Sequence, residues 1–219
     1  MRLQSAIFDM DGTLLDSMPT WRELGPTFLK EAGITATPEQ DRMLHILADC
    51  DVIPYLQEVC GLPWSQQEII DQIIQRMETF YSSQVRPKPG LEKFLSILKM
   101  EGVWMYVATA THRRLTEKAL KTAGIDHYFR GIVTSADAGN HKSESADIYE
   151  MAMRRLQSNK RDTVVFEDAL HAIRTAKAAG FRVAGVYEAT AEQDQPEIQR
   201  PVSYTHLRAN ETVLDLVCR

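Results

Sequence analysis

Short apolar runs alternate with amphipathic helical patterns along most of this chain, and this alternation restricts the fold more than any other feature of the sequence. Five runs have the length and composition of buried strands: 6–8, 103–109, 131–134, 163–168 and 182–186. Helical patterns lie between or beside them, at about 91–99, 114–123, 145–157 and 169–179. Apolar strands that alternate with helices are typical of a parallel sheet covered on both faces. The sequence therefore predicts an α/β fold.

The stretch from about residue 18 to residue 84 interrupts this rhythm, because it contains helical patterns without convincing strands between them. Two capping boxes, Thr37–Gln40 and Ser65–Glu68, mark helix starts within it. The second is followed by apolar residues at helical spacing: Ile69, Ile70, Ile73, Ile74, Met77, Phe80 and Tyr81. The sequence therefore predicts an all-helical insert after the first strand, with a proline-stiffened exit at 85–90.

Composition narrows the functional classes. The 219 residues suffice for a core domain with a smaller insert, and a net charge of -5 does not favour nucleic-acid binding. Three cysteines, Cys50, Cys60 and Cys218, form no CxxC pair, so a disulfide framework is not expected. No apolar run approaches the length of a membrane span, and the first residues do not resemble a signal peptide. We therefore expect a cytoplasmic protein that binds neither membrane nor nucleic acid.

Several of the predicted strands end in side chains that can do chemistry. In an open parallel sheet, ligands bind beyond the carboxyl ends of the strands, so these side chains should gather at one edge. They are Asp9 and Asp11, Thr109, Lys142 in a loop, and Glu167 with Asp168.

The acidic residues predict a metal site. Asp9 and Asp11 are two positions apart, so in an extended chain their side chains point the same way. Carboxylates that close repel each other unless a cation lies between them or one is protonated. Asp168 would add a third carboxylate, and a ligand set made only of oxygen suits Mg²⁺. Taken alone, an Asp-x-Asp-Gly segment is also typical of an exposed turn.

The other candidate positions also have plainer interpretations when each is taken alone. Thr109 is a β-branched residue of the kind that strands favour. Lys142 is compatible with a solvated loop, and Glu167 with Asp168 forms an acidic pair that suits a helix N-terminus. Their order and spacing favour one shared site.

The segment from Asp9 to Ser17, with the sequence DMDGTLLDS, resembles the first motif of the haloacid dehalogenase (HAD) superfamily. The similarity runs from about residue 4 to residue 188. It implies a Rossmann-like parallel sheet core with an inserted all-helical cap domain. On this resemblance we expect residues 1–16 and 86–200 to form the core and residues 17–85 to form the cap.

The resemblance also implies a reaction. Asp9 would attack phosphorus and form an aspartyl phosphate, the covalent route open to a carboxylate nucleophile. Asp11 would protonate the leaving oxygen and then activate the hydrolytic water. Asp11 would also bind Mg²⁺ through its backbone carbonyl.

The remaining roles follow from the same resemblance. Thr109 and Lys142 resemble the phosphate-binding residues of the family. Asp168 resembles its metal ligand, and Glu167 lies beside Asp168 without binding the metal directly. The segment after Lys142 departs from the family pattern, because it lacks prolines and its acid, Asp147, is five residues away rather than four.

These features predict a Mg²⁺-dependent phosphatase that hydrolyses a small-molecule phosphate monoester, with sugar phosphates among the candidates. The alternative is a sugar phosphomutase similar to β-phosphoglucomutase, which shares these motifs and passes the phosphoryl group to a sugar hydroxyl instead of water. A non-catalytic binding module is the third reading, and the presence of Asp9, Asp11 and Asp168 argues against it.

Segment 201–219 resembles a translated sequencing-adapter segment that contaminates some assembled genes, so we derive no function from it.

Overall fold

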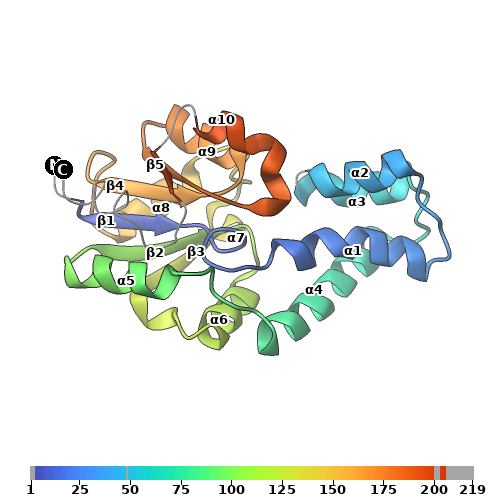
Figure 1. Cartoon of the computed structure of the whole chain (residues 1–219), viewed down its shortest axis with the longest axis horizontal. Helices are drawn as coiled ribbons and strands as arrows, with labels where there is room; N and C mark the ends of the chain where they lie inside the picture. The colour runs from blue at the N-terminus through green and yellow to red at the C-terminus, as the bar shows by residue number, and fades with distance from the viewer. Residues whose placement is uncertain (1–2, 48, 200–202, 206–219) are drawn as a thin grey trace.

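The computed structural model of this chain describes residues 3–47, 49–199 and 203–205. An α/β lobe and a helical lobe lie side by side (Figure 1). All pairings in the sheet are parallel, in the order β3-β2-β1-β4-β5-β6. The strands are β1 (Ser5–Phe8), β2 (Trp104–Thr109), β3 (Phe129–Thr134), β4 (Thr163–Glu167), β5 (Arg182–Val186) and β6 (Ser203–Thr205). The predicted α/β fold is confirmed.

Strand β6 was not predicted. It lies in segment 201–219, which the sequence analysis set aside, and it pairs with β5 from Ala184 opposite Ser203 to Val186 opposite Thr205. The rest of that segment, 201–202 and 206–219, lies outside the described residues. The resemblance of segment 201–219 to an adapter sequence stays a hypothesis.

Helices cover both faces of the sheet because alternate strand residues point to opposite sides. Ala6 and Phe8 belong to the apolar cluster on one face, whereas Ile7 belongs to the cluster on the other. The first face is covered by α5 (Leu91–Met100) and α6 (Arg113–Thr122). The second is covered by α8 (Asp147–Arg155), α9 (Leu170–Ala178) and α10 (Gln195–Gln199) (Figure 1). Short helical turns complete the lobe: η1 (Asp126–Tyr128), α7 (Ser135–Ala138) and η2 (Ala189–Asp194).

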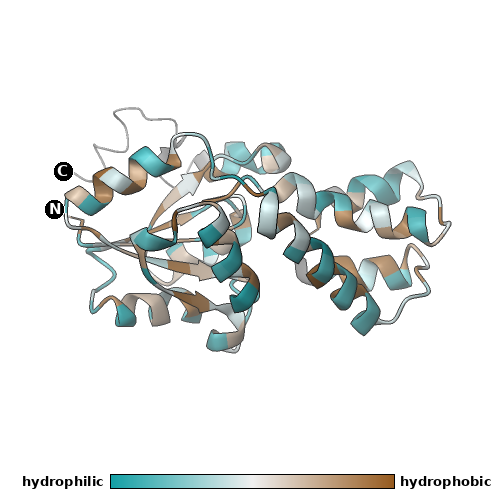
Figure 2. Ribbon diagram, turned by 90° about the horizontal axis from the view of Figure 1, so that it is seen from below, coloured by the Kyte–Doolittle hydropathy of each residue, from teal (hydrophilic) through white to brown (hydrophobic). Residues whose placement is uncertain are grey.

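The helical lobe is the predicted insert, and in the chain it lies between β1 and α5. It consists of α1 (Met18–Glu31), α2 (Pro38–Ile46), α3 (Asp49–Glu58) and α4 (Gln66–Ser83). Both predicted capping boxes are present, at the starts of α2 and α4. From the predicted apolar stripe of α4, Ile69, Met77 and Tyr81 are buried. In Figure 2 the strands are coloured mainly as hydrophobic, whereas hydrophilic residues line much of the outer helical surface.

The two segments that connect the lobes pair with each other. The Asp16 amide donates to the Arg86 carbonyl at 3.0 Å, and the Lys88 amide donates to the Leu14 carbonyl at 2.9 Å. The Lys88 ammonium lies 2.5 Å from the Glu188 carboxylate, which follows β5. Both connections are therefore tied to each other and to the core.

Among the described residues, every helix is too short or too polar to cross a bilayer.

Candidate active site

The strand order reverses at β1, and this is where the acidic residues meet. Strands β1 and β4 are neighbours, with Phe8 opposite Phe166. The next residues along the two strands are Asp9 and Glu167, and the Asp9 amide donates to the Phe166 carbonyl at 3.0 Å. Crevices at such reversal points, beyond the carboxyl ends of the strands, are where open α/β sheets bind ligands.

Three carboxylates form a buried cluster there. Asp9, Glu167 and Asp168 each offer an oxygen, and these oxygens all lie within 4.8 Å of one another. The three residues are only 3%, 0% and 4% exposed. The cluster brings together Asp9 and Asp168, which we expected to be metal ligands, and Glu167, which we expected beside Asp168.

Lys142 is the cation of this cluster. Its ammonium lies 2.6 Å from Asp9 Oδ1 and 2.7 Å from Glu167 Oε1. Tyr149, which the sequence analysis did not identify, donates its hydroxyl to the same Glu167 oxygen at 2.9 Å. Glu167 therefore holds Lys142 against Asp9, although the segment around Lys142 departs from the family pattern.

The negative charge of the cluster exceeds what Lys142 neutralises. Burial raises the pKa of Asp9 well above its usual range, against the opposing effect of Lys142. Burial, followed by the charge of Glu167, raises the pKa of Asp168 to about 7. Burial alone would lower the pKa of Lys142, but the charges of Asp9 and Glu167 raise it well above its usual range.

A divalent cation fits these donors. All three cluster members offer oxygen, and burial raises the pKa of Asp9 and Asp168, so a cation beside these carboxylates would favour their ionised forms. Mg²⁺ and similar hard cations prefer carboxylate oxygens and would supply this positive charge.

Asp11 faces a different set of partners. Its Oδ1 accepts hydrogen bonds from the Ser17 hydroxyl at 2.6 Å and the Tyr81 hydroxyl at 2.5 Å. Its Oδ2 accepts from the Thr111 hydroxyl at 2.7 Å. Burial, with the charge of Asp11, raises the pKa of Tyr81 well above its usual range. The Asp11 carboxylate is not part of the acidic cluster. The metal contact expected of Asp11 is through its backbone carbonyl, and this contact stays a prediction.

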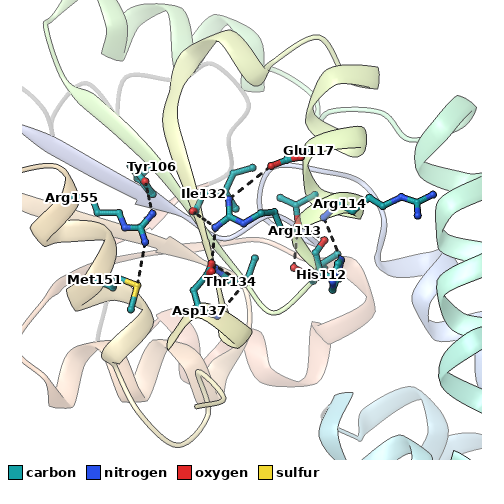
Figure 3. Close-up of polar contacts among 12 residues, drawn as sticks. Tyr106, His112, Arg113, Arg114, Glu117, Ile132, Thr134, Asp137, Met151 and Arg155 are labelled. Atoms are coloured by element: carbon teal, nitrogen blue, oxygen red, sulfur yellow. Dashed lines mark hydrogen bonds and ion pairs between the residues drawn. The ribbon is translucent and has the colours of Figure 1, made fainter. Parts of the chain in front are cut away.

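Thr109 lies at the end of β2 and is 1% exposed. Its hydroxyl oxygen accepts a hydrogen bond from the Thr111 amide at 3.1 Å, which shapes the turn after the strand. Arg113 fastens the next residues by donating to Asp137 at 2.7 Å and to the Ile132 carbonyl at 3.0 Å (Figure 3). The turn that carries both threonines is therefore held in place, and phosphate binding by Thr109 stays a prediction.

Gly12 and Thr13 pack against Asp168. The Thr13 hydroxyl donates to Asp168 Oδ1 at 2.7 Å. Gly12 has a φ of +81°, and a Cβ placed on it would lie 2.3 Å from Asp168 Oδ2. Only glycine fits here, because both the backbone conformation and the space exclude a side chain.

Gly12→Ala is therefore expected to damage the site more than the fold. The methyl group must push Asp168 away, and displacements of about 1 Å at an active site cost roughly 10²-fold in rate. Backbone strain adds a loss of about 1–3 kcal/mol in the free energy of unfolding. Phosphate-release kinetics and thermal denaturation measure the two effects.

Gly124→Ala is the matched control. Gly124 has a φ of +73°, and a Cβ there would meet nothing within 4 Å. This variant should lose stability but keep its activity. Equal activity losses in the two variants would contradict the role assigned to the contact between Gly12 and Asp168.

The chain is similar to known proteins over most of its length. Residues 6–186 match the family described as haloacid dehalogenase-like hydrolase. A phosphorylated carbohydrates phosphatase from Thermotoga maritima is 26% identical over 185 residues, which cover 84% of this chain and 85% of the relative. The fructose-1-phosphate phosphatase YqaB from Escherichia coli strain K12 is 26% identical over 190 residues, which cover 84% of this chain and 97% of the relative.

A solved structure shares the fold. The crystal structure of CbbY from Rhodobacter sphaeroides in complex with phosphate has a TM-score of 0.78 to this chain at 20% sequence identity. The match covers 94% of this chain and 96% of that one.

Proposed function

Because this chain belongs to the haloacid dehalogenase-like hydrolases, we propose that it is a Mg²⁺-dependent phosphatase that hydrolyses the phosphate monoester of a small phosphorylated carbohydrate. The main support is the contact of 2.6 Å between Lys142 and Asp9 within a buried carboxylate cluster. The carbohydrate class is suggested by the two phosphatases to which the chain is similar.

In the first half of the reaction, a carboxylate oxygen of Asp9 attacks phosphorus. A bond forms between this oxygen and phosphorus while the bond from phosphorus to the sugar oxygen breaks. Asp11 gives a proton to the departing sugar oxygen, so the sugar leaves as an alcohol.

In the second half, water attacks the phosphorus of the aspartyl phosphate, and Asp11 takes a proton from it. The bond between phosphorus and Asp9 breaks, which releases inorganic phosphate and restores the Asp9 carboxylate. Asp11 thus acts first as an acid and then as a base.

The other residues bind and orient the phosphoryl group. Lys142 neutralises charge on its oxygens and on Asp9, and Thr109 donates a hydrogen bond to it. Carboxylates of Asp9 and Asp168, with the backbone carbonyl of Asp11, would hold Mg²⁺. The cation supplies positive charge that offsets the charge of the phosphoryl oxygens.

The domain boundaries belong to this proposal. Residues 1–16 and 86–200 form the catalytic core, whose sheet is extended by β6 (Ser203–Thr205), and residues 17–85 form the cap. The cap contributes Tyr81 to the surroundings of Asp11, so it borders the place where the sugar leaves. Cap residues would therefore select the substrate.

A panel of sugar phosphates tests the function. The purified chain should release inorganic phosphate in the presence of Mg²⁺ and stop when EDTA removes the metal. β-Glucose 1-phosphate belongs in the panel, with glucose 6-phosphate followed as a product. Conversion between the two with negligible phosphate release would replace the phosphatase proposal with a phosphomutase, and no turnover at all would contradict both.

Magnesium is expected to stabilise the protein more at a pH of about 8.5 than at about 5.5. The pKa of Asp168 is raised to about 7 without metal, and a metal ligand must be ionised, so protons compete with Mg²⁺ below that pH. At a pH of about 5.5 this competition weakens metal binding by roughly 30-fold. Thermal denaturation with Mg²⁺ or EDTA at both pH values measures the effect.

The metal-free protein should show the opposite trend. The folded-state pKa of Asp168 lies above its unfolded value, so its contribution to stability is lost as the pH rises from about 4 toward 7. Asp168→Asn should weaken this trend, to which the raised pKa of Asp9 also contributes, and should remove the stabilisation by Mg²⁺. A stabilisation of the same size at both pH values would contradict the prediction.

A further inference from the structure

The carboxylate of Asp11 is bound by hydroxyl groups from both lobes. Tyr81 donates to it from α4 in the helical lobe, at 2.5 Å. Thr111 donates to it from the turn after β2, in the α/β lobe, at 2.7 Å. Ser17, which directly precedes α1, donates from the connection between the lobes, at 2.6 Å. The orientation of Asp11 therefore depends on groups that belong to both bodies of the molecule.

The direction of the bond from Tyr81 is set by a fourth residue. The Trp21 indole nitrogen on α1 lies 3.0 Å from the Tyr81 hydroxyl and can only donate. The Tyr81 oxygen therefore accepts from Trp21, and its single proton goes to Asp11. The chain of donors runs from Trp21 through Tyr81 to Asp11.

The position of Tyr81 is set by packing within the helical lobe. The residue is 0% exposed and belongs to the apolar cluster that also contains Leu24, Phe28 and Met77. Its hydroxyl is the part of the side chain that reaches Asp11. A shift of α4 relative to the sheet would move this hydroxyl away from the Thr111 hydroxyl, so Asp11 could not keep both bonds.

We propose that Tyr81 is a positioning residue through which the cap orients the Asp11 carboxylate for proton transfer to the departing sugar oxygen. This inference rests on the proposed function of Asp11. The relative position of the two lobes thereby controls the first chemical step. Trp21 supports the arrangement by fixing the direction of the Tyr81 hydroxyl.

Leaving groups of different basicity test the inference. A sugar alkoxide must be protonated as it departs, whereas dinitrophenolate departs without a proton. Tyr81→Phe keeps the ring and removes only the hydroxyl. We expect kcat/KM to fall by roughly 10-fold or more for a sugar phosphate and by less than about 3-fold for 2,4-dinitrophenyl phosphate. A general loss of structure would lower both values by the same factor.

Two control variants distinguish an error in the proposed role of Asp11 from an error in the proposed role of Tyr81. Asp11→Asn should show the same leaving-group selectivity with a larger loss of kcat/KM. If Asp11→Asn lowered kcat/KM equally for both substrates, the proposed function of Asp11 would be wrong. Tyr128→Phe removes a comparable hydroxyl bond, 2.6 Å long, to Ser96 in the core and should leave both kcat/KM values unchanged. If Asp11→Asn is selective and Tyr81→Phe is not, the positioning role is wrong.

A second variant keeps the test decisive if Tyr81→Phe does not fold. Trp21→Phe removes the indole donor and leaves the Tyr81 hydroxyl free to turn. It should show the same selectivity with a smaller effect. Equal losses for both substrates in Trp21→Phe would overturn the inference.

Discussion

Asp9→Asn is expected to reduce phosphate release by roughly 10³-fold or more, because the amide oxygen is a poor nucleophile toward phosphorus. The remaining site should still bind substrate, since Lys142 keeps its contact with Glu167 at 2.7 Å. Steady-state kinetics with a sugar phosphate measure the loss. Mass spectrometry of acid-quenched enzyme should show a phosphorylated peptide containing Asp9 in the wild type and none in the variant.

This substitution should leave the metal-free fold intact. Burial raises the pKa of Asp9, which means that the folded protein disfavours its charge. A neutral asparagine therefore removes an unfavourable charge, and the melting temperature should stay the same or rise at neutral pH. Asp16→Asn is the matched control, because Asp16 is an exposed carboxylate in the same loop, and it should retain activity. Wild-type turnover by Asp9→Asn would refute the assignment of the nucleophile.

Lys142→Met is expected to lose both stability and activity. The ammonium contacts Asp9 and Glu167, and its side chain is only 11% exposed. Removing one partner of a buried ion pair leaves uncompensated charge and typically costs about 3–5 kcal/mol in the free energy of unfolding. The phosphoryl group would also lose the cation that faces it. Urea denaturation and phosphate release measure the two losses.

The stability loss of Lys142→Met should depend on pH. Asp9 and Asp168 already have pKa values above the usual range, and the variant would raise them further. Acids with a raised folded-state pKa destabilise the fold as the pH rises, so the variant should be least stable above about pH 7 and recover on acidification.

A double variant separates stability from catalysis. Lys142→Met combined with Glu167→Gln removes one charge of each sign, so much of the lost stability should return while activity stays lost. A double variant as unstable as Lys142→Met would contradict the electrostatic explanation. Wild-type phosphate release by Lys142→Met would contradict its role in phosphate binding.

The fold was predictable from the sequence because its signals are local. Apolar strands and amphipathic helices have different periods, and capping boxes such as Thr37–Gln40 mark helix starts within four residues. The same holds for Asp9 and Asp168, which directly follow buried strands, so a parallel sheet brings them to one edge. Strand β6 was missed because it is three residues long and lies in a segment that had been set aside.

Lys142 shows how tertiary structure adds to a motif. The pattern around it departs from the family, and a loop lysine taken alone is more typical of solvent. Its burial against Asp9 and Glu167 comes from the packing of segments far apart in the chain, and Tyr149 adds a bond to Glu167 that no spacing rule predicts.

The sequence by itself determined the class of fold, the place of the helical insert and the acidic residues at the strand ends. These features are encoded by residues close together in the sequence: the spacing of apolar residues, and the polar residues that directly follow each strand. Both can be recognised without knowing the tertiary structure. Only the tertiary structure decided what surrounds Asp11. Its donors Tyr81 and Thr111 lie 70 and 100 residues away, and their hydroxyls reach it only after the two lobes have packed together. Such contacts depend on side-chain positions in three dimensions, and no local pattern encodes them.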